Sequence, residues 1–155
     1  MSAPEDTPDP VMTRLLAAQE MATAGERDAA AAAFAEVWAE VGEDGDPLHV
    51  VTLAHYMADV QDDPRAELEW DLRALRAAER LTDGRAQEHH AALSVRGFLP
   101  SLHLNLAADH TKLGDRDAAL RHLAAAEAAV PALADDGYGR MIRGGIDRLR
   151  AELAG

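Results

Sequence analysis

Seven histidines are the side chains of this sequence best suited to bind a metal ion or to transfer a proton. His89 and His90 are adjacent, so on a helix they would point in different directions, and we interpret them as solvated loop residues. His103 and His110 lie on one face of a predicted helix, without a carboxylate or cysteine at close ligand spacing. This pattern favours a packing role for both rings, and His122 is interpreted as a surface residue. The histidines therefore predict neither a metal site nor a catalytic site.

Two acidic stretches, GEDGDP and DDGYG, superficially suggest calcium loops. The first lacks the ligand order and closing glutamate of an EF-hand, and both are better explained as helix stops and caps. The sequence contains no P-loop, G-x-S-x-G or H-E-x-x-H motif, and Glu67 with Glu69 is typical of a solvated helix surface. We therefore expect a non-enzymatic protein without metal or cofactor. An enzymatic or small-molecule-binding role stays open as an alternative, because catalytic groups can converge from scattered positions.

The composition favours helices. Of the 155 residues, 48% are hydrophobic but only 4% are aromatic, and alanine supplies much of the apolar total. Alanine is the best helix former and lets helices pack closely, while the β-branched residues typical of strands are scarce. The predicted fold class is all-α, with residues 10–155 forming a single domain. The acidic, proline-rich residues 1–9 are expected to be a disordered arm.

The charge of the chain limits its partners. The 28 acidic and 15 basic residues give a net charge of −13, which repels nucleic-acid phosphates and anionic lipids. No apolar stretch is long enough to cross a membrane, and the first residues lack the basic and apolar segments of a signal peptide. We therefore expect no nucleic-acid partner, no membrane partner and a cytoplasmic location.

Helical patterns alternate with turn signals along the chain. Asp46 before Pro47 and Asp63 before Pro64 are each typical of an N-cap followed by the first turn of a helix. A less regular stretch at 83–99 is expected to be an exposed inserted loop. Helices are predicted at about 10–23, 27–41, 47–60, 64–81, 101–113, 115–130 and 136–154.

The segment from 103 to 131 carries a repeat-type pattern. The motif W-x2-L-G-x2-Y, then A-x3-F, then P is matched in spacing by His103, Leu106, Ala107, His110, Ala119, Leu123 and Pro131. The segment therefore resembles a tetratricopeptide repeat, with Leu-Gly-Asp as the turn between its two helices. His103 and His110 replace the usual aromatic residues of that family, and Leu123 replaces its phenylalanine.

Two weaker copies of the pattern precede this segment. They are carried by Ala17, Ala18, Met21, Ala30 and Phe34, and by Leu53, Ala54, Met57, Ala66 and Trp70. Ala18, Ala54 and Ala107 are the equivalent small residues where two helices cross, since a larger side chain would hold the backbones apart. The resemblance implies an α-solenoid of three tetratricopeptide-like helix pairs, at about 10–41, 47–82 and 100–131, with a C-terminal capping helix at about 136–154.

In the tetratricopeptide family, the first helix of each pair lines a concave groove that holds a peptide segment. By equivalent position, the resemblance implies a peptide-binding strip formed by Gln19, Thr52, His55, Asp59, Asn105 and Lys112. Asn105 stands where the family often uses an asparagine to bond the backbone amide of a ligand. The alternative for Asn105 is a helix-surface residue bonded to a neighbouring helix.

The expected function is therefore a non-catalytic scaffold that binds a peptide segment of an unidentified protein partner. The strong negative charge favours a neutral or basic segment. A second hypothesis is a self-associating structural module, for example a homodimer formed through alanine-rich faces. The third hypothesis is the small-molecule-binding or enzymatic role.

Overall fold

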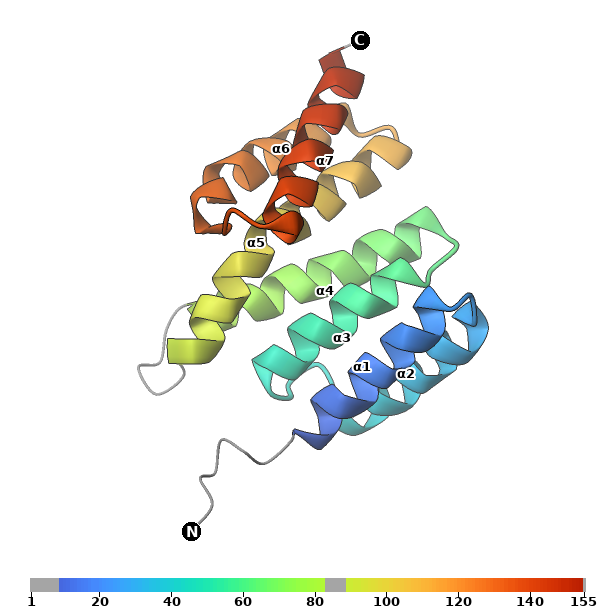
Figure 1. Ribbon diagram of the computed structural model, residues 1–155. Helices are drawn as coiled ribbons and strands as arrows, with labels where there is room; N and C mark the ends of the chain where they lie inside the picture. Colours follow the sequence, from blue (N-terminus) through green and yellow to red (C-terminus); the bar gives the residue numbers. More distant parts are fainter. Residues whose placement is uncertain (1–8, 83–88, 155) are drawn as a thin grey trace.

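Helices make up every regular element in the part of the chain that the structure describes. The computed structural model describes the backbone of residues 9–82 and 89–154 and the side chains of residues 9–80 and 99–154, and in these ranges it contains no strand. The elements are α1 (Pro10–Thr23), α2 (Arg27–Val41), α3 (Pro47–Asp59), α4 (Pro64–Thr82), α5 (His89–Lys112), α6 (Arg116–Ala129), the 3₁₀ turn η3 (Val130–Ala132) and α7 (Gly137–Ala154) (Figure 1). The all-α fold class predicted from the composition is thereby confirmed for the described residues. Among them, no helix has the length and apolar character needed to cross a membrane.

Local signals in the sequence define where several helices begin and end. Asp9 caps α1 by accepting hydrogen bonds from the backbone N–H groups of Val11 and Met12 at 3.0 and 3.2 Å. Apart from Asp9, the arm predicted at residues 1–9 lies outside the described residues. Gly25 after α1 and Gly114 after α5 have φ values of 93° and 80°, a backbone conformation with a low steric cost only for glycine. These glycines let the chain reverse within a few residues.

Helices that follow one another in the sequence pack side by side (Figure 1). The contact is most extensive between α3 and α4 and between α5 and α6, followed by α4 with α5 and α1 with α2. The last helix, α7, packs against both α5 and α6. The molecule is therefore built from successive helices, each in contact with its neighbours in the sequence.

Three clusters of buried apolar residues hold the helices together. The first joins α1, α2 and α3 through residues such as Leu15, Phe34 and Leu53. The second joins α3, α4 and α5 and includes alanines of α4, and the third joins α5, α6 and α7 and includes Leu123 and Ile146. Helices α3 and α5 thus each contribute to two clusters.

The three small residues expected at helix crossings are buried. Ala18, Ala54 and Ala107 have 1%, 0% and 0% of their surface exposed, respectively. Each belongs to a different one of the three buried clusters. Alanine at these positions leaves no room for a larger side chain without displacing the neighbouring helix.

The stretch predicted as an inserted loop at 83–99 is largely helical, and this prediction was wrong for residues 89–99. They form the first part of α5, whereas residues 83–88 lie outside the described residues. The helix predicted from about 101 thus begins earlier, and Pro100 lies inside α5 and is buried. A proline inside a helix removes one backbone hydrogen bond. Leu99 packs against the second buried cluster, and this burial offsets part of that loss.

Candidate functional site

Five of the six predicted groove residues, all except Asp59, line three separate hollows along α1, α3 and α5. Gln19 lines a hollow of about 400 Å³ on α1, together with Leu16 and Thr23. Thr52 and His55 line a much smaller pocket on α3. Asn105 and Lys112 line a cleft of about 600 Å³ between α5 and α7. The larger spaces are therefore at the first and third of these helices.

The cleft between α5 and α7 has an apolar floor and charged edges. It is lined by Leu104, Asn105, Ala108, Thr111 and Lys112 from α5 and by Gly145, Arg148, Leu149 and Glu152 from α7. Gly145 allows the close approach of the two helices, because a Cβ atom there would lie 2.8 Å from Cδ2 of Leu104. The cleft thus owes part of its shape to a glycine in the middle of α7.

Asn105 contacts the neighbouring helix. Its Nδ2 lies 3.4 Å from Nδ1 of His55, so the side chain links α5 to α3. Burial lowers the pKa of His55, which keeps the ring neutral and its Nδ1 able to accept a hydrogen bond from the amide. The contact uses only the Nδ2 of Asn105 and leaves its Oδ1 as an acceptor. Asn105 therefore makes the contact with a neighbouring helix that the alternative interpretation expects, and it also lines the cleft.

The other predicted groove residues differ in their access to solvent. Thr52 is only 6% exposed, and its hydroxyl donates to the Leu48 carbonyl at 2.9 Å, so it serves the helix itself. Asp59 is exposed at the end of α3. Gln19 is half-buried, and its Oε1 is buried without a hydrogen-bond partner among the described residues. Lys112 is exposed at the rim of the cleft.

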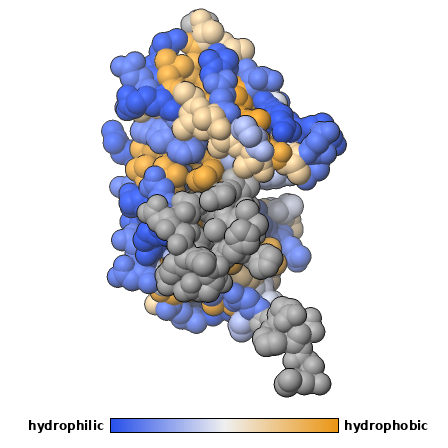
Figure 2. All heavy atoms as spheres, turned by 90° about the vertical axis from the view of Figure 1, so that its left-hand side faces the viewer, coloured by the Kyte–Doolittle hydropathy of each residue, from blue (hydrophilic) through white to orange (hydrophobic). Residues whose placement is uncertain are grey.

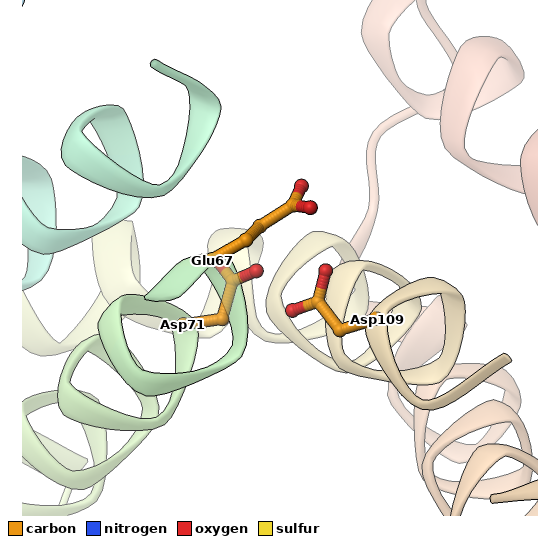
Figure 3. Close-up of side chains that lie close together, drawn as sticks. All are labelled: Glu67, Asp71 and Asp109. Atoms are coloured by element: carbon orange, nitrogen blue, oxygen red, sulfur yellow. The ribbon is translucent and has the colours of Figure 1, made fainter. Parts of the chain in front are cut away.

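A cluster of three carboxylates lies where α4 meets α5, next to the rim of the cleft. It consists of Glu67 and Asp71 from α4 and Asp109 from α5 (Figure 3). One carboxylate oxygen from each residue lies within 4.8 Å of the other two. Asp71 and Asp109 are each only 1% exposed. Lys112 reaches the cluster from outside, with Nζ 2.9 Å from Oε1 of Glu67. We name this group the acid cluster.

Electrostatics keep one proton in the acid cluster at neutral pH. Burial and the neighbouring carboxyl of Asp109 raise the pKa of Asp71 to about 10. Burial also raises the pKa of Asp109, while the hydrogen bond from Asp71 lowers it. Asp71 is therefore the protonated partner and donates to the Asp109 carboxylate.

Sequence reasoning missed the acid cluster. Glu67 was interpreted as a solvated helix residue, but it is partly buried beside Asp71. The signal that points to Asp71 is its position on the face of α4 that carries the buried Ala74 and Ala78. Asp109 likewise follows the buried Leu106 on α5 by three residues. Acidic residues on a buried helix face are uncommon and deserve a structural explanation.

Three of the histidines stack between α5 and α6. The ring of His122 lies 5.4 Å from the ring of His103 and 5.4 Å from the ring of His110, at interplanar angles of 27° and 5°. Nδ1 of His103 is 3.2 Å from Nδ1 of His122. The surface assignment of His122 was wrong, because the ring is half-buried between the other two. Stacked faces are typical of packing, and this agrees with the role predicted for His103 and His110.

No protein-family model, curated protein or solved structure matches the chain. The resemblance to tetratricopeptide repeats therefore rests on the spacing of residues in this sequence. Function has to be inferred from the cleft, the acid cluster and their contacts.

Proposed function

We propose that the protein is a non-catalytic binding scaffold of the tetratricopeptide type, which holds a peptide segment of a partner protein along α1, α3 and α5. The observation that carries this proposal is the cleft of about 600 Å³ between α5 and α7 with Asn105 in its wall. The hollow on α1 that contains Gln19 and Leu16 would take a more distant part of the same segment. The successive packing of the helices is consistent with such an array.

The chemistry of the cleft suits an extended peptide. Leu104, Ala108 and Leu149 offer apolar surface to a side chain of the segment. Asn105 offers both a donor and an acceptor, which match the carbonyl and N–H of a peptide bond. Glu152 and the net charge of −13 favour a neutral or basic segment.

The experiment compares wild-type protein with Asn105→Ala. Tagged forms of both would capture partners from the source cell, and the bound segment would be mapped and synthesised for calorimetric titration. We expect Asn105→Ala to weaken binding by about tenfold, which corresponds to about 1.4 kcal/mol, the net strength of one hydrogen bond. Melting should fall only slightly, because the substitution removes one long contact to His55 and no buried apolar group. Equal binding by both proteins would contradict the proposal.

Two further variants separate a loss of binding from a change in structure. Ala108→Gln would fill the cleft while leaving Asn105 in place, and it should also weaken binding. Glu36→Ala on α2 is the matched control, because Glu36 is exposed and lies outside the cleft. A peptide that binds Ala108→Gln as tightly as wild type does not occupy this cleft.

Self-association is a second candidate function, favoured by apolar residues at the surface. Leu16 on α1 is 51% exposed, and Tyr138 and Met141 on α7 are 40% and 59% exposed. On the face shown in Figure 2, hydrophobic residues lie at the surface of the half of the molecule that contains α6 and α7. Sedimentation at several concentrations, with Met141→Glu as the comparison, tests this function. A monomer at every concentration would exclude it.

A further inference from the structure

We infer that the acid cluster, formed by Glu67, Asp71 and Asp109, binds one divalent cation of the hard, oxygen-preferring class, with calcium as the preferred ion. Carboxylate oxygens are the ligands that Ca²⁺, Mn²⁺ and Mg²⁺ prefer in proteins. The site lies between α4 and α5, apart from the proposed peptide contacts of Asn105.

The spacing of the oxygens matches a calcium ion. Ca²⁺ binds oxygens at about 2.3–2.6 Å, so ligands on opposite sides of the ion are about 4.6–5.2 Å apart. The three carboxylates present oxygens that all lie within 4.8 Å of one another. Mg²⁺ demands a near-ideal octahedron at about 2.0–2.1 Å, whereas Ca²⁺ tolerates irregular geometry, which suits three carboxylates that come from two different helices. One oxygen from each of the three carboxylates can therefore contact the same calcium ion.

Unpaired buried oxygens are the second observation. Oδ1 of Asp71 and Oδ2 of Asp109 are buried, and apart from the proton that the two carboxyl groups share, no described residue donates a hydrogen bond to them. Figure 3 shows the two carboxyl groups turned toward each other across the space between α4 and α5, with Glu67 extending beside them. A buried polar atom without a partner costs roughly 1–3 kcal/mol, and a buried carboxylate costs more. A bound cation would pair these oxygens directly.

The surroundings of the acid cluster provide both access and charge. The side chain of Glu67 is 21% exposed, so an ion can reach the cluster from its side. Lys112 is the cation that contacts Glu67, and its side chain is 53% exposed at the rim. With Asp71 protonated, one lysine does not balance the two charged carboxylates of Glu67 and Asp109, and Asp59 adds further negative charge nearby. A divalent cation would neutralise the remainder, with water completing its coordination.

The first measurement is direct binding to the full-length, metal-free protein. Calcium chloride would be titrated calorimetrically at pH 7.5, and manganese(II) chloride would be followed by the loss of its free-ion electron paramagnetic resonance signal. We expect one ion per chain and a dissociation constant of roughly 10⁻⁵–10⁻³ M. Absence of binding of both ions up to several times that range would overturn the inference, and the shared proton alone would then account for the aspartate pair.

Asp71→Asn is the decisive variant. The asparagine amide keeps the shape of the side chain and can donate to Asp109 as the protonated carboxyl of Asp71 does. The variant should therefore fold without the ion but lose ion binding by at least tenfold. Binding equal to wild type would place the ion elsewhere and overturn the inference.

Two exposed or partly exposed positions keep the test valid if Asp71→Asn does not fold. Glu67→Gln should weaken binding by at least tenfold, and Glu69→Gln is the matched control because Glu69 is exposed on the same helix. Lys112→Met removes the competing ammonium from Glu67 and should strengthen binding severalfold. Equal loss with Glu67→Gln and Glu69→Gln would mean that only the overall negative charge attracts the ion, and it would overturn the inference. Weaker binding by Lys112→Met would contradict an ion that competes with this ammonium for Glu67, and it would overturn the inference as well.

Discussion

Asp71 on α4 and Asp109 on α5 face each other in the interface of the two helices, and each is 1% exposed. Their carboxyl groups hold one proton between them, because two adjacent buried carboxylates cannot both be charged at low cost. The pair couples the packing of α4 against α5 to the protonation of a single group. Several measurable properties depend on that coupling.

The first prediction concerns alkaline pH. The pKa of Asp71 is about 10 in the folded protein, against 3.8 for an ordinary aspartate, so the folded state keeps a proton that the unfolded state releases. The free energy of unfolding should therefore fall as pH rises toward 10, by up to about 1.4 kcal/mol per pH unit. Urea unfolding in a chelating buffer between pH 7 and pH 9.5 measures this slope. Asp71→Asn should flatten it, and a wild-type protein with constant stability over that range would contradict the shared proton.

The second prediction concerns acidic pH and the stacked histidines. Burial, followed by the neighbouring His103, lowers the pKa of His122 to about 4, with smaller contributions from His110 and Arg121. The unfolded chain has the ordinary value of 6.5, so it binds a proton that the folded state excludes. This contribution to stability is complete above pH 6.5 and is lost as pH falls toward 4.

His122→Phe tests the contribution of the stack. The phenyl ring fills a similar space but carries no charge, so the variant should lose less stability than wild type between pH 7 and pH 5. Melting temperatures at the two pH values give the comparison. Identical losses in the two proteins would show that acid sensitivity comes from other groups.

The third prediction concerns the buried alanine of α5. Ala107 has no exposed surface and belongs to the cluster that joins α5, α6 and α7. Ala107→Leu should reduce the free energy of unfolding by about 1–3 kcal/mol, because the added atoms force the helices apart. Ala128→Leu on α6 is the control, since Ala128 is exposed and a leucine there adds bulk without overpacking. An unchanged urea midpoint for Ala107→Leu would show that the helices packed around Ala107 can accommodate a leucine without moving apart.

The fourth prediction uses two glycines of α7 with opposite surroundings. A Cβ atom at Gly144 would meet only the end of the Arg148 side chain at 3.3 Å, so Gly144→Ala should stabilise the helix by about 0.5–1 kcal/mol. A Cβ atom at Gly139 would lie 2.1 Å from the backbone oxygen of Ala134, which cannot move away cheaply. Gly139→Ala should therefore destabilise the protein despite the same gain in helix propensity. Thermal melting of the two variants checks the difference in sign.

Much of the fold could be predicted from the sequence because the helix boundaries are locally encoded. Asp46 accepts a hydrogen bond from the N–H of Leu48 at 3.0 Å, in agreement with the cap predicted before Pro47. The start of α5 was missed for the opposite reason, since Pro100 is a local stop signal and the packing of Leu99 is a tertiary effect. Local sequence rules predict a helix boundary correctly when residues close in sequence determine it. They fail when packing against residues distant in sequence determines it.

The features of the candidate site divide in the same way, into those set within one helix and those that need the relative position of two helices. The register of a single helix places Asn105 and Lys112 on the same side of α5, but the cleft that they line is completed by α7, whose position the register of α5 does not give. The acid cluster and the histidine stack could not be predicted, because each needs the relative position of two helices. Asp71 and Asp109 are 38 residues apart in numbering, and no spacing rule along one helix connects them.

Helices α3 and α5 each contribute side chains to two buried clusters. A force that pulls α1 and α7 apart would thus be transmitted from one buried cluster to the next through α3 and α5. The interface between α4 and α5 contains the acid cluster, where one proton or one ion determines whether the carboxyl groups of the two helices attract or repel each other. The resistance of the molecule to stretching would then depend on the protonation or ion occupancy of the α4–α5 interface. The helices on either side of this interface could be held more or less rigidly against each other while their own buried clusters stay unchanged.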